Sequence, residues 1–154
     1  MNYDSSAVTA ENLEHIYHSK IPISKHMGLK VISFEHNRLL LGAPLYNNIN
    51  HQESVFGGSL FSIAALAGWG ILQLKMSQLG ISANTVIAGG EVGYSAPVFS
   101  DFICMCSLPE GDKWIEFEQK LKNSGKGSVR LSSVILSEGR TCMNFDGNYV
   151  LSIG

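Results

Sequence analysis

The sequence has few cysteines, and their spacing suits neither a disulfide framework nor a metal site. Cys104, Cys106 and Cys142 are odd in number and include no Cys-x-x-Cys pair, which argues against a disulfide-stapled fold and against a zinc knuckle. The first residues, 1–6, lack the basic start of a secretory signal, and no apolar stretch follows them. We therefore expect a cytoplasmic protein that holds no metal.

A surplus of charge is also absent. The chain carries 11 Lys and Arg against 13 Asp and Glu, a formal net charge of −2, so the concentrated basic surface that nucleic acid requires is not expected. With 45% hydrophobic and 16% charged residues in a chain of 154, the composition excludes a disordered chain or a coiled coil. We expect one globular domain over residues 1–154, with small molecules or proteins as partners.

One stretch lacks charge altogether. From Val55 to Leu74 the only polar side chains are those of Ser59, Ser62 and Gln73, so a helix here would be apolar on every side and would need lipid or a sheet around it. The stretch is long enough to be considered as a membrane span. Its four glycines and the strand patterns that follow favour a helix buried in a soluble domain, and we expect no membrane partner.

The rest of the sequence shows alternating strand and helix patterns. Thr9 is a candidate cap for a first helix, and Trp114, Phe117 and Leu121 repeat at the spacing of an amphipathic helix. In order, the expected elements are a helix at Glu11–Ser19, strands at Lys30–Phe34 and Arg38–Leu45, the central helix, strands at Asn84–Tyr94 and Phe102–Leu108, a helix at Asp112–Lys122, and a hairpin turning at Glu138-Gly139 between strands that start at Val129 and Thr141. Hairpin connections predict an α+β fold with a curled antiparallel sheet of about six strands around the central helix, and this arrangement resembles the hotdog fold.

Several segments resemble those of a known family. They are Ile21-Pro22-Ile23 to Met27-Gly28, Asn50 to Leu60, Leu66-Ala67-Gly68-Trp69-Gly70, Tyr94 to Pro97 and Phe145 to Val150. Together they resemble a bacterial family of hotdog thioesterases that also occurs as the C-terminal domain of an acetyltransferase fusion and includes malonyl-acyl carrier protein decarboxylase-like members. The resemblance implies a homodimer or dimer of dimers that acts on acyl groups carried by coenzyme A or by the 4′-phosphopantetheine of acyl carrier protein. It implies no cofactor of the protein's own.

The sequence departs from the pattern of better-known hotdog thioesterases. Those enzymes carry a His-Gly-Gly-like motif, followed by a carboxylate further along the helix. Here Phe56 stands at the position of the His, and Ala64-Ala65 stand at the position of the carboxylate. The central helix therefore offers no general base and no activated nucleophile.

The remaining chemistry lies before and at the start of the helix. The backbone N–H groups of Gly57 and Gly58, with Ser59, would form an oxyanion hole at the positive end of the helix, unless these glycines only permit close packing. The amide of Asn50 could orient a thioester carbonyl or a water, or could simply stabilise a turn. His51 and Glu53 are candidate general bases, with solvated loop positions as the alternative.

Two further groups of residues complete the candidate site. Phe56, Glu91 and Tyr94 could line an acyl pocket, although an outward strand position for Glu91 and a core position for Tyr94 are the alternatives. The second group could receive the phosphates of coenzyme A or an acidic carrier protein, or could be a solvated basic surface. Its members are Lys122, Lys126 and Arg130.

Three functions remain open. Hydrolysis of an acyl thioester is the first, because the family resemblance points to it, although only Asn50, His51, Glu53 and Glu91 are available to activate a water. Decarboxylation of a malonyl thioester is the second, because it requires an oxyanion hole but no initial proton abstraction. The third is a binding module that holds an acyl chain without turnover. The sequence does not define the acyl length or the carrier.

Overall fold

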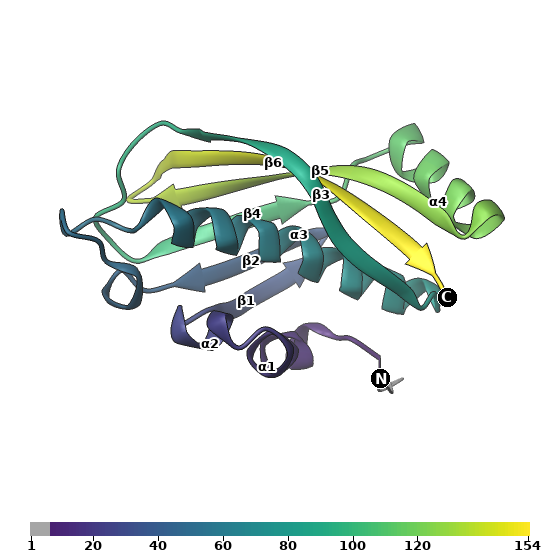
Figure 1. The fold of residues 1–154 in the computed structure, drawn as a ribbon, viewed down its shortest axis with the longest axis horizontal. Helices are drawn as coiled ribbons and strands as arrows, with labels where there is room; N and C mark the ends of the chain where they lie inside the picture. Colours follow the sequence, from purple (N-terminus) through teal and green to yellow (C-terminus); the bar gives the residue numbers. More distant parts are fainter. Residues whose placement is uncertain (1–6) are drawn as a thin grey trace.

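The computed structural model describes residues 7–154 and shows a curled six-stranded sheet that packs against one long helix (Figure 1). All neighbouring strands are antiparallel, in the order β1-β2-β4-β5-β6-β3. The elements are α1 (Ala10–Lys20), α2 (Ile23–His26), β1 (Lys30–Glu35), β2 (Arg38–Ala43), the 3₁₀ turn η1 (Tyr46–Asn48), α3 (Gly57–Leu79), β3 (Ala83–Tyr94), β4 (Phe102–Ser107), α4 (Asp112–Ser124), β5 (Lys126–Ser137) and β6 (Arg140–Ile153). This arrangement confirms the α+β hotdog prediction.

Local sequence signals account for several of these elements. Thr9 caps α1 in a reciprocal capping box with Asn12, as the sequence predicts. The end of α3 lies at Gly80, whose φ of 68° is the left-handed conformation that favours glycine. The helix therefore ends five residues beyond the uncharged stretch, since Lys75 continues it. The short elements α2 and η1 were not expected from the sequence.

One flank of α3 packs tightly on the sheet. Its residues Ile63, Ala64, Ala67 and Ile71 are fully buried. Glycine at position 70 is required there, because a Cβ would lie 1.8 Å from the hydroxyl oxygen of a tyrosine on α1. Close approach of this kind lets α1 and the sheet bury this flank of the apolar helix.

The other flank of α3 is not covered. Beside it lies β3, an edge strand whose residues 86–95 are all exposed. Among the described residues, α3 is the one helix with the length and hydropathy of a membrane span, and half of its apolar window is buried inside the domain. The sheet therefore curls around α3 as predicted, but in a single chain it leaves this flank of the helix partly exposed.

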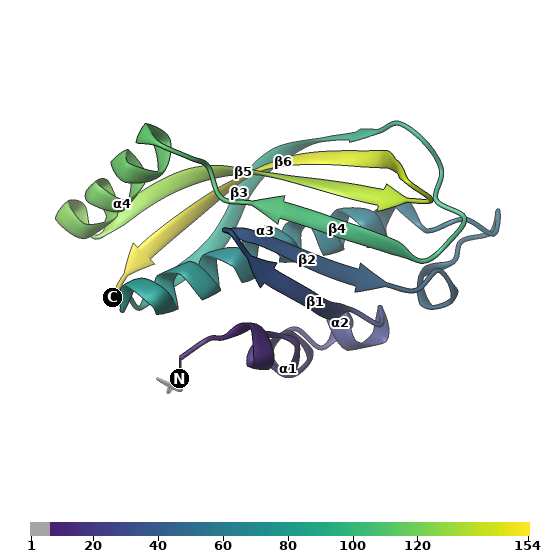
Figure 2. The ribbon, with the colours of Figure 1, turned by 180° about the vertical axis from the view of Figure 1, so that it is seen from behind.

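Helix α4 follows β4 in the chain and packs against β5 and β6. Phe117 and Leu121 are buried and Trp114 packs against the same core, which confirms the predicted amphipathic stripe. In Figures 1 and 2, α4 lies near the C-terminal end of α3, at the opposite end of the molecule from the loops that precede α3. The two ends of the molecule therefore present different surfaces.

Candidate functional site

The loop that leads into α3 is a tight turn closed by Asn50. The side-chain Oδ1 of Asn50 accepts hydrogen bonds from the backbone N–H of Gln52 at 2.9 Å and of Ser54 at 3.1 Å. Its Nδ2 donates to the Ser54 hydroxyl at 3.0 Å, and its own backbone N–H donates to the Ser54 carbonyl. The carboxamide of Asn50 therefore shapes the turn, which is the alternative that the sequence left open for it.

The two candidate bases lie at the tip of this turn. His51 and Glu53 are both exposed, and Glu53 has a φ of 62°. A left-handed non-glycine residue at a loop tip presents its side chain to solvent rather than to the helix start. Within this chain alone, neither side chain lines the cavity beside α3.

The start of α3 leaves two backbone donors unpaired. Phe56 occupies the N-cap position without a side-chain cap, and its carbonyl accepts the N–H of Ser59 at 2.9 Å. No described residue supplies an acceptor for the N–H of Gly57 or Gly58. Unpaired donors at the positive end of a helix of 23 residues favour a partial negative charge.

A small cavity lies beside the first residue of α3. It has a volume of about 300 Å³, and one of its walls is Gly57. The Tyr94 hydroxyl donates to the Gly57 carbonyl at 2.9 Å, which fixes the end of β3 to the first turn of α3. Neither carboxylates nor cations line it; the lining residues are Val55, Gly57, Leu60, Tyr94, Ser95, Ala96, Pro97 and Val98.

Two contacts that the sequence did not reveal hold this region in place. Asn48 is buried, and its Nδ2 donates to the carbonyls of Met27 and Pro44 at 2.9 and 2.8 Å. The carbonyl of Asn48 accepts the N–H of Phe56, and the carbonyl of Val98 accepts the N–H of Val55. The only sequence signal for these roles was the Asn-rich run before the helix and the Ser-Ala-Pro turn after β3.

The part of α3 that would carry a carboxylate in better-known relatives is sealed against the sheet. Hydroxyl groups of Ser133 and Tyr149 donate to the carbonyls of Ala64 and Ala65, at 3.3 and 2.8 Å. Burial raises the pKa of the Tyr149 hydroxyl well above its ordinary value, so this group stays neutral. The middle of α3 is therefore a packed core and not a second half of the site.

The buried thiols are equally unsuited to nucleophilic chemistry. Burial raises the pKa of the Cys106 thiol to about 11 and raises that of Cys104 well above its ordinary value. A thiol of this kind is not ionised at neutral pH, and the thiolate is the reactive form. Within residues 7–154, no three His, Cys, Asp or Glu side chains gather as metal ligands.

The remaining candidate residues lie away from the α3 cavity. Glu91 sits on the opposite face of β3, with its side chain 84% exposed and 3.7 Å from the guanidinium of Arg130. Lys122 pairs with Glu118 one turn earlier on α4, at 3.4 Å. Lys126 is exposed at the start of β5. The structure thus separates Glu91 from Tyr94, and it does not bring Lys122 and Lys126 together with Arg130 around one cavity.

The fold and this site define a thioesterase-like protein of the hotdog class, and comparison with known proteins agrees. A family described as "Putative thioesterase (yiiD_Cterm)" matches residues 10–153. A Chlorobaculum tepidum protein of known structure is 30% identical, with 94% of each chain covered and a TM-score of 0.89. A Shewanella oneidensis protein described as a putative thioesterase is 31% identical, with 94% of this chain and 97% of that chain covered and a TM-score of 0.84.

A third structure extends the similarity of fold. A probable thioesterase from Pseudomonas aeruginosa covers 97% of this chain and 99% of its own, with a TM-score of 0.81 at 19% identity. At that identity the match supports the fold alone. The family match over nearly the whole chain shows that the protein belongs to the yiiD C-terminal thioesterase family. Its general role is that of a thioesterase-type hydrolase.

Proposed function

We propose that the protein acts on acyl thioesters carried by coenzyme A or acyl carrier protein, with the thioester carbonyl oxygen bound at the start of α3. The observation that carries this proposal is the pair of unpaired N–H groups of Gly57 and Gly58 at the start of α3, where Gly57 forms part of the wall of a cavity without charged walls. An oxyanion in such a place gains more from each donor than it would in water, because the surroundings are weakly polar.

Hydrolysis is the first reaction that this site would serve. Water attacks the thioester carbon, the carbonyl oxygen becomes an oxyanion held by the two amides, and the carbon–sulfur bond then breaks to give an acid and a free thiol. The attacking water needs a base, and we assign this role to His51 or Glu53. These side chains would have to reach the thioester from the exposed turn, in the same subunit or in a neighbouring one, while Asn50 holds the turn in shape.

Decarboxylation of a malonyl thioester is the second candidate, and the lining of the cavity favours it. The carbon–carbon bond to the carboxylate breaks, carbon dioxide leaves, and the electron pair forms an enolate whose oxygen the two amides stabilise; solvent then supplies a proton. No cation lines the cavity to hold the carboxylate, so its burial there would favour its loss. This reaction requires no base within the cavity and no cofactor.

We further propose that the working form is a homodimer, or a dimer of dimers, built through the open edge of β3. An unpaired edge strand is a template for pairing with another strand. Val86, Ile87 and Val92 of β3 and Phe61 of α3 are exposed beside it, and a second copy would cover them. A Val92→Lys variant should be monomeric in light scattering, whereas Glu91→Gln on the outer face should not; a dimeric Val92→Lys protein would contradict this assembly.

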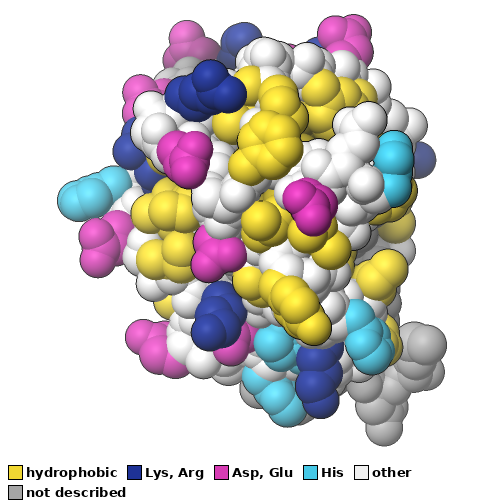
Figure 3. Space-filling view, turned by 90° about the vertical axis from the view of Figure 1, so that its left-hand side faces the viewer, with side chains coloured by type: hydrophobic (Ala, Val, Ile, Leu, Met, Phe, Trp, Pro, Cys, Tyr) yellow, Lys and Arg dark blue, Asp and Glu magenta, His cyan; other side chains and the backbone are white. Residues whose placement is uncertain are grey.

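The loops around the cavity add to this apolar surface. Figure 3 shows hydrophobic side chains spread over the end of the molecule where these loops lie. The large exposed hydrophobic residues of the loops are Tyr46, Ile49, Phe56 and Phe99. An acyl chain longer than the cavity can hold would meet this surface. We propose the cytoplasm as the location of the protein, because acyl carriers would be met there. If no substrate is turned over, the protein would be a module that binds an acyl chain.

A single pair of assays separates the candidates. A thiol reagent detects hydrolysis of acyl-coenzyme A and acyl carrier protein substrates, because only hydrolysis frees a thiol. Carbon dioxide release from malonyl carriers detects decarboxylation. Free thiol in proportion to substrate consumed supports the hydrolase, and carbon dioxide without thiol replaces it with the decarboxylase. No turnover of any carrier, with acyl chains still bound, would contradict both reactions.

A further inference from the structure

A second and larger cavity lies between α4 and β5. Its volume is about 680 Å³, within the usual range for small-molecule sites. Ser128, Arg130 and Ser132 of β5 line it and alternate with Val129 and Leu131, which are buried toward the core. Because Val129 also lines it, the cavity reaches both faces of β5. It lies beside α4, at the opposite end of the molecule from the loops that precede α3 (Figure 1).

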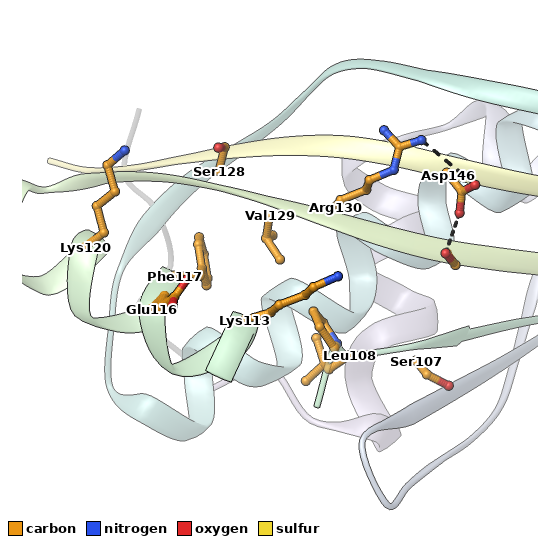
Figure 4. Close-up of a pocket in the computed structure, with 12 residues that line it drawn as sticks. Ser107, Leu108, Lys113, Glu116, Phe117, Lys120, Ser128, Val129, Arg130 and Asp146 are labelled. Carbon is orange, nitrogen blue, oxygen red and sulfur yellow. Dashed lines mark hydrogen bonds and ion pairs between the residues drawn. The ribbon is translucent and has the colours of Figure 1, made fainter. Parts of the chain in front are cut away.

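Cations from two elements meet around this cavity. In Figure 4, Lys113 and Lys120 project from α4 along one side, and Arg130 lies on β5 across from them. Within the part of the chain that the structure describes, neither lysine has a carboxylate oxygen within 4.0 Å of its ammonium. Two positive charges are therefore not neutralised by ion pairs.

The acidic groups of the cavity do not cancel these charges. Asp146 accepts a hydrogen bond from the Ser132 hydroxyl and lies 4.0 Å from Arg130, so it is already engaged. Glu116 is the one carboxylate lining the cavity that has no partner among the described residues. It lies between the two lysines in sequence and is free to accept a hydrogen bond from a hydroxyl or amino group of a ligand.

The rest of the lining is divided between apolar walls and hydroxyl groups. Leu108, Phe117 and Val129 are largely buried and contribute apolar surface, while the hydroxyls of Ser107 and Ser128 lie at the lining. Such a lining would contact a ring or another apolar part of a ligand. The cations would contact an anionic part, and phosphate is the anion that several lysines and hydroxyls hold together.

We propose that the cavity between α4 and β5 binds a phosphorylated small molecule of nucleotide size. Lys113 and Lys120 contact its phosphates with the Ser128 hydroxyl, and the apolar walls hold the remainder. Arg130 is held by Glu91 and Asp146 and borders the cavity. The site differs from the expected set of Lys122, Lys126 and Arg130, because Lys122 is paired with Glu118 and points to a different neighbour. It does not depend on the proposed acyl-thioester reaction, because the two cavities share no lining residue.

The test is a titration of the full chain with ADP, followed by calorimetry and by the fluorescence of Trp114, which lies on α4 with its ring 5.1 Å from that of Phe117. ADP should bind saturably and adenosine at least about tenfold more weakly, since charged hydrogen bonds to phosphate are lost. The double variant Lys113→Gln, Lys120→Gln should lose at least about tenfold in affinity for ADP. The matched control Lys122→Gln, on the same helix but outside the cavity, should bind as the unaltered protein does.

Three results would overturn the proposal. They are no saturable binding of ADP at millimolar concentration, equal binding of adenosine, and an equal loss in Lys122→Gln. Thermal unfolding of each variant shows whether it is folded, and all three lysines are exposed, so the folds should be kept. The acyl-thioester assays are run on the same double variant; unchanged turnover there, with ADP binding lost, distinguishes a failure of this site from a failure of the proposed reaction.

Discussion

The two cavities of this protein lie at opposite ends of the molecule and differ in almost every physical property. The one at the start of α3 is about 300 Å³ and has no charged wall, with unpaired backbone amides at its edge. The one beside α4 is about 680 Å³ and has three cations and two carboxylates in its lining. The first suits a neutral carbonyl that becomes an oxyanion, and the second suits a ligand that is already charged. Charged side chains thus lie where they are solvated, and backbone donors lie where the surroundings are weakly polar.

The largest expected effect comes from removing one backbone donor at the α3 cavity. Gly57→Pro deletes the N–H at the first position of the helix, where proline is tolerated, and Phe56 already has the φ of −57° and ψ of 128° that precede proline well. We expect kcat/KM for the active thioester substrate to fall by about 10²–10³-fold.

The matched control keeps the donor and adds only a methyl group. In Gly57→Ala the new Cβ would lie 3.4 Å from the Tyr94 ring, an ordinary contact, so turnover should stay within a few-fold. Equal activity of the proline and alanine variants would remove the amide of Gly57 from the mechanism and would leave the α3 cavity without its distinguishing feature.

The next effect concerns the buried thiol of Cys106 on β4. Burial raises the pKa of Cys106 from 9.0 to about 11, so the folded state keeps the neutral thiol while the unfolded state ionises. The stability that this provides is complete below pH 9 and is lost as the pH rises toward 11. We expect the free energy of unfolding to fall by about 3 kcal/mol from this group over that interval.

Chemical denaturation between pH 8 and 11 under reducing conditions measures this change. Cys106→Ser or Cys106→Ala removes the thiol and should make the pH dependence in that range less steep, whatever it does to stability at pH 8; the part due to Cys104, whose pKa burial also raises, should remain. A free energy of unfolding that stays constant up to pH 11 in the unaltered protein would show that water reaches the Cys106 thiol in the folded state.

A smaller effect is expected at the turn before α3. Asn50→Ala removes the side-chain acceptor for two backbone N–H groups and should lower turnover by about tenfold and stability by about 1 kcal/mol. Asn50→Asp keeps the acceptor oxygens and should lie closer to the unaltered protein in both measurements. If instead Asn50→Asp were as inactive as Asn50→Ala while remaining stable, the amide N–H would contact the substrate directly.

The smallest effect is expected from the hydroxyl that fixes the wall of the cavity. Tyr94→Phe removes the hydrogen bond to the Gly57 carbonyl but keeps the ring, so stability should change by about 1 kcal/mol or less. Turnover should fall only a few-fold, mainly through KM, because the ring still bounds the cavity. A collapse of kcat alone would assign the hydroxyl a part in the reaction.

Much of the fold could be predicted from the sequence, because local physics decides it. Thr9 and Asn12 form the expected capping box, the stripe of Phe117 and Leu121 is buried, and the turn at Glu138-Gly139 joins β5 and β6. The open flank of α3 could not be predicted. A helix without charge carries no pattern that tells a flank covered by its own sheet from one left for another chain.

The candidate site was harder to predict than the fold, for two physical reasons. The residues that line the α3 cavity come mostly from loops, where Val55 and Val98 are joined by a backbone hydrogen bond that side-chain patterns do not encode. The cations that meet beside α4 come from two different elements, α4 and β5, and their grouping depends on which side of β5 Arg130 faces. Glu91 does not reach the α3 cavity, because alternate strand residues face opposite sides of the sheet and Glu91 faces the side opposite to Tyr94.

The most direct test of the central claim is the infrared carbonyl stretch of a bound, non-hydrolysable thioester analogue with a labelled carbonyl. Hydrogen bonds from the Gly57 and Gly58 amides should shift this stretch to lower frequency on binding to the unaltered protein and to Gly57→Ala, and the shift should be reduced in Gly57→Pro. A carbonyl frequency in the unaltered protein that matches the free analogue in an apolar solvent, with the analogue bound, would contradict the account.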